Sequence, residues 1–592
     1  MAQTNERPDP AAPAGISRRT LLTASAAAAP LLMVPRKSQA QVLVLPPSPP
    51  TTPWVEELPL QDTPLSPVST PLTPTPSLLA NAAGGECGRV AHQRYFDLCG
   101  PGSRTGVDAI QYQLTAKENP SWYFNGGNPY YPAQPIWGFE GNTPGALTPG
   151  PTIHARYGQP ILCRIFNALP QFSTGFGSPE ISTHLHNMHT PSESDGFAGD
   201  FYSPTKMGPT LNAPGAFKDH FWPNLYAGID EFGGIGDPRE ALGTLFYHDH
   251  TEGVTAPNVI KGLAGRYNIY DHLDTGNELT GLRLPSGPYD YPLTFGDRRF
   301  NVDGQLTYDQ LNPDGIIGDK VLVNGKIEPV LRVARRKYRF RLLNSGPTRF
   351  YELYLQNKFA SSVYMFQIIS HDGNLLPNPL NNQLQTRLAP AERTDVIIDF
   401  ARFPLGTELY LVNMLVQNST RRPEKVQAPG TRLLKFVVDR NAPDDSQVPS
   451  VLRPLRPLPD AAELATLPVR RFNFERSGGM WAVNGRFFNV FEPTASPRKG
   501  SAEIWEFTNI DNGWQHPVHV HFEEGRILSK TVNGVAVPIP LIERGRKDVF
   551  VVGERMTMRV LFRFRDFTGK YMMHCHNLAH EDHAMMVRWD IV

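Results

Sequence analysis

The chain has 592 residues, and its 57 Lys and Arg side chains balance its 57 Asp and Glu side chains. A net charge near zero gives no electrostatic reason to expect binding to nucleic acid or to an anionic membrane. At roughly 100–200 residues per domain, the length predicts three or four domains. Fifty Gly and 57 Pro, without a long amphipathic helical run, favour a loop-rich, all-β architecture.

The first 40 residues have the pattern of an export signal. Arg18 and Arg19 precede an apolar run that ends near Val34, and Ser38-Gln39-Ala40 fits a small-x-small cleavage site. The paired arginines predict a twin-arginine-type signal peptide over residues 1–40, and hence a periplasmic or secreted protein that is exported already folded. An ordinary Sec signal or a disordered arm is the alternative. The run is too short to span a bilayer as a helix, and we expect no transmembrane segment in the mature chain.

A Pro-rich leader is predicted over residues 41–84. Its runs of proline, such as Pro46-Pro47-Ser48-Pro49-Pro50, alternate with Ser and Thr and offer few side chains from which a core could be built. The segment is therefore either a mobile, extended arm or a strap that lies on the folded body.

The chain has only four cysteines. Cys87 and Cys99 lie close enough in sequence to form a disulfide in an oxidising compartment, or they remain free thiols. Cys163 belongs to an apolar run, residues 161–166, and is expected to be a packed core thiol. Cys575 is left for metal or redox chemistry.

From about residue 85 the sequence reads as short strands between Gly/Pro turns, and its composition loosens at 271–288 and at 440–468. These breaks predict three domains, at residues 85–272, 285–440 and 465–592. In the middle domain Lys337 to Leu342 alternates between basic and apolar side chains, which predicts a half-buried strand. Asp395 to Phe400 is a second strand candidate. The middle domain has no cluster of soft metal ligands, so we expect it to space and orient the outer two.

Pairs of histidines separated by one residue occur in the first and third domains. His184 and His186 form one pair, His248 and His250 form another, and His516-Pro517-Val518-His519-Val520-His521 contains a third. On a strand this spacing puts both rings on one side, which is the minimum for holding a metal ion between neighbouring elements. A single pair is weak evidence, because solvated or core histidines explain most examples. Several such motifs in one chain favour a shared metal centre.

The strongest signal is the segment from His574 to Met585, in which a thiol, four imidazoles and a thioether lie within twelve residues. This soft nitrogen and sulfur ligand set favours copper. Cys575, His580 and Met585 match three of the four ligands of a blue-copper electron-transfer centre, and the second imidazole must come from elsewhere. If Met572 to His576 is a strand, Cys575 faces one copper ion while the histidines on either side face another. The alternative is a buried cysteine in a histidine-rich strand.

In this order the motifs resemble the ligand pattern of the multicopper oxidases: H-L-H, H-D-H, H-P-V-H-V-H and H-C-H-x-x-x-H-x-x-x-x-M. Supporting resemblance covers most of residues 85–592 and includes Pro149 to Ile153, Asn258 to Gly265 and Leu388 to Val396. Within the family the sequence is most similar to the spore-coat-type bacterial laccases and to the bilirubin oxidases.

The resemblance implies an all-β fold of three cupredoxin-like Greek-key β-sandwich domains, with four copper ions. It assigns the single type 1 copper to His516, Cys575, His580 and, as the axial ligand, Met585. It assigns the single type 2 copper to His184 and His519. It assigns the pair of type 3 coppers to His186, His248, His250, His521, His574 and His576. The three-copper cluster would then lie between the first and third domains, since both contribute histidine pairs.

Five residues lie beside the proposed ligands without being ligands themselves. Asn187 stands where the family usually has Gly, and Asn tolerates positive φ better than most residues. Phe246 stands where Trp is common. Asp249, between two ligand histidines, should point away from the metal and fix its loop. His189 and His583 lie next to ligand motifs but are not expected to be ligands.

The resemblance also implies the reaction. A small-molecule reducing substrate loses one electron at a time, and O2 is reduced to two waters. We expect phenolic or aromatic amine donors to deliver electrons through the exposed edge of His516 or His580, and Cys575 to pass them to the histidines beside it. Asp195 and Glu581 match acidic positions that supply protons in the closest relatives. The alternatives are that Asp195 organises a turn and that Glu581 orients a ligand imidazole.

A periplasmic metal-ion oxidase acting on Cu(I), Mn(II) or Fe(II) is the nearest alternative function. Periplasmic cuprous oxidases carry a Met-rich insertion near the type 1 site, and this chain, with 13 Met in all, has no such block. A non-enzymatic copper-binding or structural envelope protein is a further alternative, but such relatives have typically lost ligands, and here every ligand position is filled. We expect a monomer.

Overall fold

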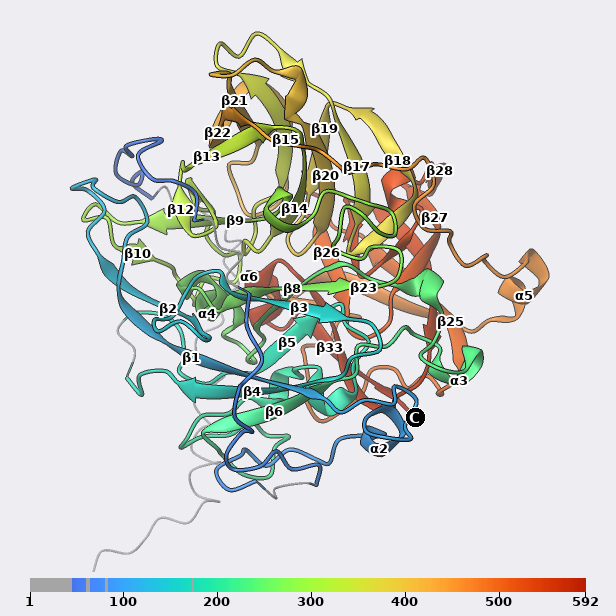
Figure 1. The fold of residues 1–592 in the computed structure, drawn as a ribbon. Coiled ribbons are helices and arrows are strands. Elements are labelled where there is room, and N and C mark those ends of the chain that lie inside the picture. Colours follow the sequence, from blue (N-terminus) through green and yellow to red (C-terminus); the bar gives the residue numbers. More distant parts are fainter. Residues whose placement is uncertain (1–44, 60–63, 80–82, 173–174) are drawn as a thin grey trace, which may run out of the picture. The chain divides into compact units, whose positions relative to one another are not determined.

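The computed structural model describes residues 45–59, 64–79, 83–172 and 175–592 (Figure 1). The predicted export signal at residues 1–40 lies outside the described residues, as does part of the predicted Pro-rich leader. Residues 46–592 form one unit, built of six β-sheets joined by loops and short helices. The predicted all-β fold class is confirmed. Within the described ranges, no helix is both long and apolar enough to cross a bilayer.

The first pair of sheets has the strand orders β2-β1-β4-β6 and β3-β8-β7-β5. The strands are β1 (Ile110–Trp122), β2 (Gln134–Glu140), β3 (Gly150–Arg156), β4 (Ile161–Ala168), β5 (Thr183–His186), β6 (Phe217–Trp222), β7 (Thr244–Asp249) and β8 (Ala264–Tyr270). Short helices join them: α2 (Tyr95–Leu98), η1 (Ser192–Ser194), η2 (Ala198–Asp200), α3 (Ile229–Phe232), η3 (Pro238–Glu240) and α4 (Thr255–Lys261). Buried side chains from both sheets, among them Leu114, Ile165 and Tyr247, share one hydrophobic core.

The middle pair has the orders β12-β11-β9-β14-β20-β17-β18, with β10 on β9, and β13-β22-β21-β15-β16, with β19 on β15. The strands are β9 (Asp290–Phe300), β10 (Leu306–Thr307), β11 (Lys320–Val323), β12 (Lys326–Ile327), β13 (Val330–Arg335), β14 (Lys337–Asn344), β15 (Tyr351–Asn357), β16 (Val363–Tyr364), β17 (Phe366–His371), β18 (Asn374–Gln383), β19 (Gln385–Leu388), β20 (Arg393–Asp399), β21 (Glu408–Val416) and β22 (Lys425–Asn441). Two single-turn helices, η4 (Gly287–Tyr289) and η5 (Phe400–Arg402), accompany them. A second core, including Phe340 and Phe436, lies between these sheets.

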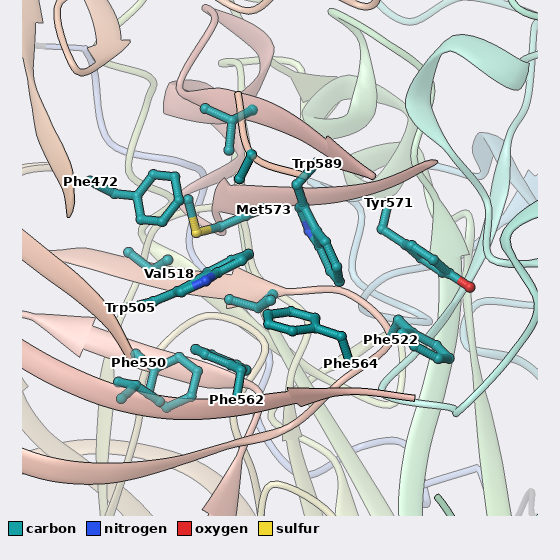
Figure 2. Close-up of a cluster of buried hydrophobic side chains, with 14 of the residues drawn as sticks. Phe472, Trp505, Val518, Phe522, Phe550, Phe562, Phe564, Tyr571, Met573 and Trp589 are labelled. Carbon is teal, nitrogen blue, oxygen red and sulfur yellow. The ribbon is translucent and has the colours of Figure 1, made fainter. Parts of the chain in front are cut away.

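The last pair has the orders β24-β23-β25-β31-β27-β28, with β29 on β27, and β30-β26-β32-β33. The strands are β23 (Val469–Ser477), β24 (Met480–Val483), β25 (Ser501–Asn509), β26 (His516–Val520), β27 (Gly525–Val532), β28 (Val535–Val537), β29 (Arg546–Lys547), β30 (Val549–Val552), β31 (Met556–Phe564), β32 (Gly569–Cys575) and β33 (Met586–Ile591). The helices are α5 (Ala461–Thr466), η6 (Leu541–Glu543) and α6 (Leu578–Asp582). Figure 2 shows the aromatic side chains, Trp505 and Phe562 among them, that fill the third core.

We propose that the three pairs of sheets are the three predicted domains, at residues 85–272, 285–440 and 465–592. The strands of each pair fall within one of these ranges, except that β22 ends one residue later, at Asn441. Each pair also encloses a core of its own.

The described part of the Pro-rich leader lies on the body as a strap. The Leu58 N–H donates to the Val330 carbonyl (2.6 Å), and the Leu65 N–H donates to the Thr152 carbonyl (2.7 Å). Leu58 is buried in the core of the middle pair, and Leu65 in the core of the first pair. Of the two interpretations of this segment, the structure therefore supports the strap.

The strand predicted at Lys337 to Leu342 is confirmed as β14, but it is not half-buried. Its polar face is covered as well, with Arg339 and Arg341 only 1% exposed. Arg339 pairs with Asp395 of the neighbouring strand β20, and Arg341 pairs with Asp290 through two bonds of 2.8 and 2.7 Å. Alternation therefore identified the strand, but ion pairing inside the protein replaced the expected contact with solvent. The second strand candidate, Asp395 to Phe400, is confirmed as part of β20 up to Asp399, whereas Phe400 begins η5.

The four cysteines are all described, all buried and all free thiols. Cys87 belongs to the core of the first pair of sheets, whereas Cys99 packs into the core of the last pair. The disulfide that their sequence spacing allowed is therefore not formed. Cys163, as expected, is a fully buried core thiol on β4.

Replacing Phe562 by alanine should destabilise the third core. The side chain is fully buried, and its ring lies 5.1 Å from Trp505 and 5.7 Å from Phe550. Phe→Ala substitutions in cores cost about 3–5 kcal/mol, from lost burial and a residual cavity. Denaturant unfolding followed by tryptophan fluorescence should show this loss for Phe562→Ala. Phe487→Ala, at a position that is 50% exposed, is the control, and equal effects of the two substitutions would contradict the prediction.

Candidate metal centre

Three side chains of the last pair of sheets form a triangle of metal-binding atoms. The Cys575 Sγ lies 3.5 Å from His516 Nδ1 and 3.5 Å from His580 Nδ1, and the two nitrogens are 3.3 Å apart. The centre of such a triangle is about 2 Å from each atom, close to the length of a metal–imidazole bond. His516 thus supplies the second imidazole that the segment from His574 to Met585 lacks.

Strand pairing and a tight loop bring these atoms together. β26 pairs with β32 so that Val518 lies opposite Cys575. After Cys575 the chain turns into α6, which carries His580. The Met585 N–H donates to the His580 carbonyl (2.9 Å), and the Cys575 N–H donates to the Met585 carbonyl (3.1 Å). The loop therefore closes on itself, and the Met585 side chain is fully buried in the same hydrophobic core as Cys575.

Eight further histidines gather at a second site. They are His184, His186, His248, His250, His519, His521, His574 and His576, and none is more than 2% exposed. Three pairs of their Nε2 atoms lie close together: His184 and His519 at 3.4 Å, His250 and His574 at 3.1 Å, and His521 and His574 at 3.2 Å. Ring centroids of His186 and His248 each lie 5.3 Å from that of His576. The structure therefore brings together every histidine that the sequence proposed for the three-copper cluster.

Two sheets, one from the first pair and one from the last, position these histidines, of which His250, His521 and His576 directly follow the ends of β7, β26 and β32. β5 pairs with β7, with His184 opposite His248, and β26 pairs with β32, with His519 opposite His574. Across the junction the His184 ring stacks on His521, with centroids 3.7 Å apart. The site therefore exists only where these two sheets meet.

The chemistry of the second site fits bound metal ions. The Nε2 of His248 and both ring nitrogens of His576 are buried without a hydrogen-bond partner, which is costly unless a ligand takes them. Burial lowers the pKa of both His248 and His250 to about 3. These imidazoles are therefore neutral, which is the form that binds metals.

Cys575 connects the two sites. It lies on β32 between His574 and His576, and successive side chains of a strand point to opposite faces. Its thiol belongs to the triangle, while its two neighbours belong to the histidine cluster. Burial raises the pKa of the Cys575 thiol, so metal binding there has to displace a proton.

Asp195 and Glu581 contact the histidine cluster from outside. The Asp195 carboxylate lies 2.8 Å from His521 Nδ1, and the Asp195 carbonyl contacts His184 Nδ1. The Glu581 carboxylate lies 2.8 Å from His574 Nδ1 and 3.6 Å from His250 Nε2. Burial raises the pKa of both carboxyl groups. Each acid can therefore orient an imidazole and hold a proton next to the cluster.

Asp548 is a further acid at the cluster that the sequence did not reveal. Its carboxylate lies 2.6 Å from His186 Nε2 and 3.3 Å from His519 Nδ1. Arg393 of the middle pair of sheets binds the same carboxylate at 3.0 Å. Burial opposes the ionisation of Asp548, but this guanidinium outweighs it and lowers the pKa. No motif surrounds Asp548, so only the tertiary structure identifies it.

The prediction that His516 or His580 has an exposed edge is wrong, because both residues have zero exposure. The Trp481 indole lies on the face of His580, with centroids 3.8 Å apart, and Trp514 approaches at 5.0 Å. The Asn577 amide occupies the other nitrogen of His580, at 3.1 Å. Sequence reasoning missed these covering residues, since a tryptophan between β-strands is usually part of a core.

The neighbouring positions behave largely as expected. Asn187 has φ = 76°, the conformation for which the family uses Gly. The Phe246 ring stacks beside His186 at 4.3 Å, so it fills the wall of the cluster. The Asp249 carboxylate accepts hydrogen bonds from Ser182 N–H and Asn258, both at 2.9 Å, and so fixes its loop.

His189 and His583 lie beside ligand motifs but have other partners. His189 Nε2 lies 2.7 Å from the Asp566 carboxylate, and its ring stacks on Phe522 with centroids 4.2 Å apart. His583 Nδ1 lies 2.8 Å from the Ala579 carbonyl. These contacts agree with the expectation that neither is a metal ligand.

A family model described as multicopper oxidase matches residues 463–592. The bilirubin oxidase of Albifimbria verrucaria is 32% identical over 451 residues, which are 75% of this chain and 71% of that protein. A laccase of Bacillus stratosphericus is 32% identical over 515 residues, covering 78% of this chain and 91% of that one. The Bacillus subtilis laccase is 31% identical over 509 residues, with coverage of 78% and 91%.

Solved structures show the same fold. The 2F4 variant of the multicopper oxidase McoA from Aquifex aeolicus has a TM-score of 0.66 and 24% identity, covering 81% of this chain and 96% of that one. A laccase from Pediococcus acidilactici has a TM-score of 0.66 and 22% identity, covering 93% and 95%.

Replacing Cys575 by serine should remove the thiolate from the triangle and leave the histidine cluster intact. The copper-loaded variant should lose the blue absorption band and bind less copper per chain than the wild type, because a serine hydroxyl is a poor soft-metal ligand. Absorption spectra and metal analysis would measure both. Cys163→Ser, a matched change at a core thiol, should keep the band. A blue Cys575→Ser protein would show that the triangle is not the coloured site.

Proposed function

The chain belongs to the multicopper oxidase family and is a laccase-like, copper-dependent oxidoreductase with O2 as acceptor, and we propose that its donors are phenols or aromatic amines. Each donor would lose one electron, and four such electrons with four protons would convert one O2 into two waters. The observation that carries this proposal is the covalent link through Cys575 between the thiol triangle and the histidine cluster.

Four copper ions would be held by the residues that the sequence resemblance assigned to them. The type 1 ion would take His516, Cys575, His580 and Met585. The type 2 ion would take His184 and His519. The type 3 pair would take His186, His248, His250, His521, His574 and His576. When bound, copper supplies one-electron redox chemistry at the first site and a place for O2 reduction at the second. The burial of every ligand ring and the unpartnered nitrogens of His248 and His576 support this assignment.

The protein's own residues would provide the path for electrons and exclude water from the cluster. The triangle of His516, Cys575 and His580 would receive the electron from the donor side, and the two residues that flank Cys575 would carry it to the cluster. The cluster is closed to solvent, with His576 at 2% exposure and His574 at zero, which would keep bulk water away from the reacting oxygen.

Asp195 and Glu581 would supply the protons. Reduction of O2 to water consumes protons inside a pocket from which water is excluded, so positioned acids are needed. The two carboxyl groups contact different ligand rings, His521 and His574 respectively, each at 2.8 Å. Each would accept the Nδ1–H of its imidazole on the facing oxygen and hold a proton on its other oxygen.

The axial position bears on the choice of donor. Met585 is buried in the loop that carries His580, and a methionine at this position tunes the redox potential of a blue-copper site. We propose a moderate potential, suited to easily oxidised donors such as methoxyphenols, aromatic diamines, azo-type dyes or bilirubin.

A metal-ion oxidase for Cu(I), Mn(II) or Fe(II) is the alternative function. A Campylobacter jejuni multicopper oxidase described as a metallo-oxidase shares the fold, at a TM-score of 0.62 and 20% identity. The two tryptophans against His580 favour aromatic donors instead. A non-enzymatic role is disfavoured, because no ligand is missing.

We also propose that the protein acts as a monomer in the periplasm or outside the cell, after export by the twin-arginine machinery. The paired arginines at residues 18 and 19 support the export route.

Oxygen uptake measured with the copper-loaded protein tests the function. With 2,6-dimethoxyphenol as donor, one O2 should disappear for every four electrons that the donor loses, without hydrogen peroxide, because the complete reaction makes only water. Fast oxidation of Mn(II), Fe(II) or Cu(I) with no phenol oxidation would instead favour the metal-ion oxidase.

Glu581→Gln and Asp195→Asn should slow turnover while leaving the blue band unchanged. Loss of a positioned acid typically costs about 100-fold or more in kcat. Glu193→Gln is the matched control, because this buried carboxylate binds Gln93 instead of a ligand imidazole. Equal kcat values for all three variants and the wild type would mean that Asp195 and Glu581 only orient their histidines.

A further inference from the structure

The type 1 triangle has no surface of its own that a donor could touch. His516 and His580 are both fully buried. The face of His580 is covered by Trp481 and one of its ring nitrogens by Asn577. An electron from an external molecule must therefore cross at least one further residue.

Trp481 makes the closest ring contact of either histidine. Its centroid lies 3.8 Å from that of His580, with an angle of 31° between the planes. Trp514 lies edge-on to Trp481 at 4.6 Å and is 5.0 Å from His580. The Trp481 indole N–H donates to the Pro313 carbonyl at 2.6 Å, which fixes the ring in place. The Trp481 indole is thus a fixed aromatic ring that packs against His580.

The ion pair between Arg476 and Asp314 lies between the Trp481 ring and solvent. The Arg476 guanidinium lies over the Trp481 ring at 4.2 Å and also pairs with Asp314. The Arg476 and Asp314 side chains are 32% and 25% exposed, whereas Trp481 is fully buried. Exposed ion pairs and cation–π contacts are both weak. The outermost layer above Trp481 is therefore the one that is easily displaced.

On the basis of the proposed laccase-like activity, we propose that a planar aromatic donor displaces the Arg476 guanidinium, stacks on Trp481 and delivers its electron through this indole to His580. A phenol then loses one electron to the oxidised type 1 site and releases its proton to water. The O2 reduced at the histidine cluster is the final electron acceptor. Aromatic rings stack favourably in the place where a flat guanidinium has lain. Hydrated metal ions cannot stack in this way, so the arrangement selects flat organic donors.

A competing entrance is a cavity of about 660 Å³ between the middle and last pairs of sheets. Its lining includes Ile368, Leu541, Ile542 and Gln515, the neighbour of His516. The cavity is linked to the triangle only through Gln515, which precedes His516 in the sequence. No aromatic side chain of its described lining contacts a ligand ring. It is the alternative binding site that the experiment must distinguish.

The first test measures donor binding without turnover. Fully reduced, O2-free enzyme is titrated with 2,6-dimethoxyphenol and followed by NMR of the donor and of the protein methyl groups. Trp481→Leu should weaken binding about tenfold, because an aromatic stack is lost, whereas Trp481→Phe should stay within about twofold of the wild type. Donor contacts to the methyl groups of Leu541 and Ile542 in the cavity, with unchanged binding to Trp481→Leu, would overturn the proposal.

The second test measures how the Arg476 guanidinium, which lies over the Trp481 ring, affects the KM for the phenol. Arg476→Gln should lower KM for the phenol, since the guanidinium no longer competes for the indole. Arg471→Gln is the matched control: it removes the same charge from the same strand, but Arg471 pairs with Glu506 and is 70% exposed. Equal KM values for the two variants would refute the role of Arg476, and this comparison still decides if Trp481→Leu does not fold.

The blue band and the copper content separate this inference from the proposed function. Both should be unchanged in all variants, while kcat/KM for the phenol falls about tenfold or more in Trp481→Leu. If wild-type enzyme is colourless or oxidises no aromatic donor, the proposed function itself fails. If the wild type oxidises phenols and Trp481→Leu matches it, only the entry route fails.

Discussion

The pairing of β26 with β32 is the constraint on which the rest of the site depends. Val518 lies opposite Cys575 and His519 lies opposite His574, so one register determines the geometry of both metal sites. A slip of one residue would turn every side chain of a strand to the other face. The aromatic core behind these strands, with Trp505, Phe562 and Trp589 fully buried, opposes such a slip because it would expose large apolar side chains to water.

The histidine cluster also requires contacts between parts of the chain that are distant in sequence. His184 meets His519, 335 residues later, and Asp195 meets His521, 326 residues later. The middle pair of sheets does more than space its neighbours, because its Arg393 binds Asp548, which in turn contacts His186 and His519. Arg393 lies on β20 beside β14, whose buried Arg339 and Arg341 form ion pairs of their own. Buried pairs of this kind add little net stability, because the loss of hydration offsets their attraction.

Sequence patterns predicted the parts of this protein that obey local rules. The spacing of His574, Cys575 and His576 predicted a strand with alternating faces, and β32 ends at Cys575 with the expected division. Alternation also located β14, but it could not show that a second layer covers the charged face. The burial of His516 and His580 was not predictable either. Trp481, which covers His580, lies 99 positions before it in the sequence, and only the fold brings the two together. Asp548 was missed for the same reason: an acid becomes significant only through the rings beside it.

The absence of disulfides among the four described cysteines gives the histidine cluster a mechanical consequence. A copper ion shared by His184 and His519, as proposed, would be a reversible cross-link between segments 335 residues apart. Closing a loop of that length in the unfolded chain carries an entropy cost on the order of 5 kcal/mol. An ion that binds only the assembled protein stabilises that assembly in proportion to its concentration and affinity. The proposed copper would thus also link the first and last pairs of sheets, and its removal would loosen the junction between them.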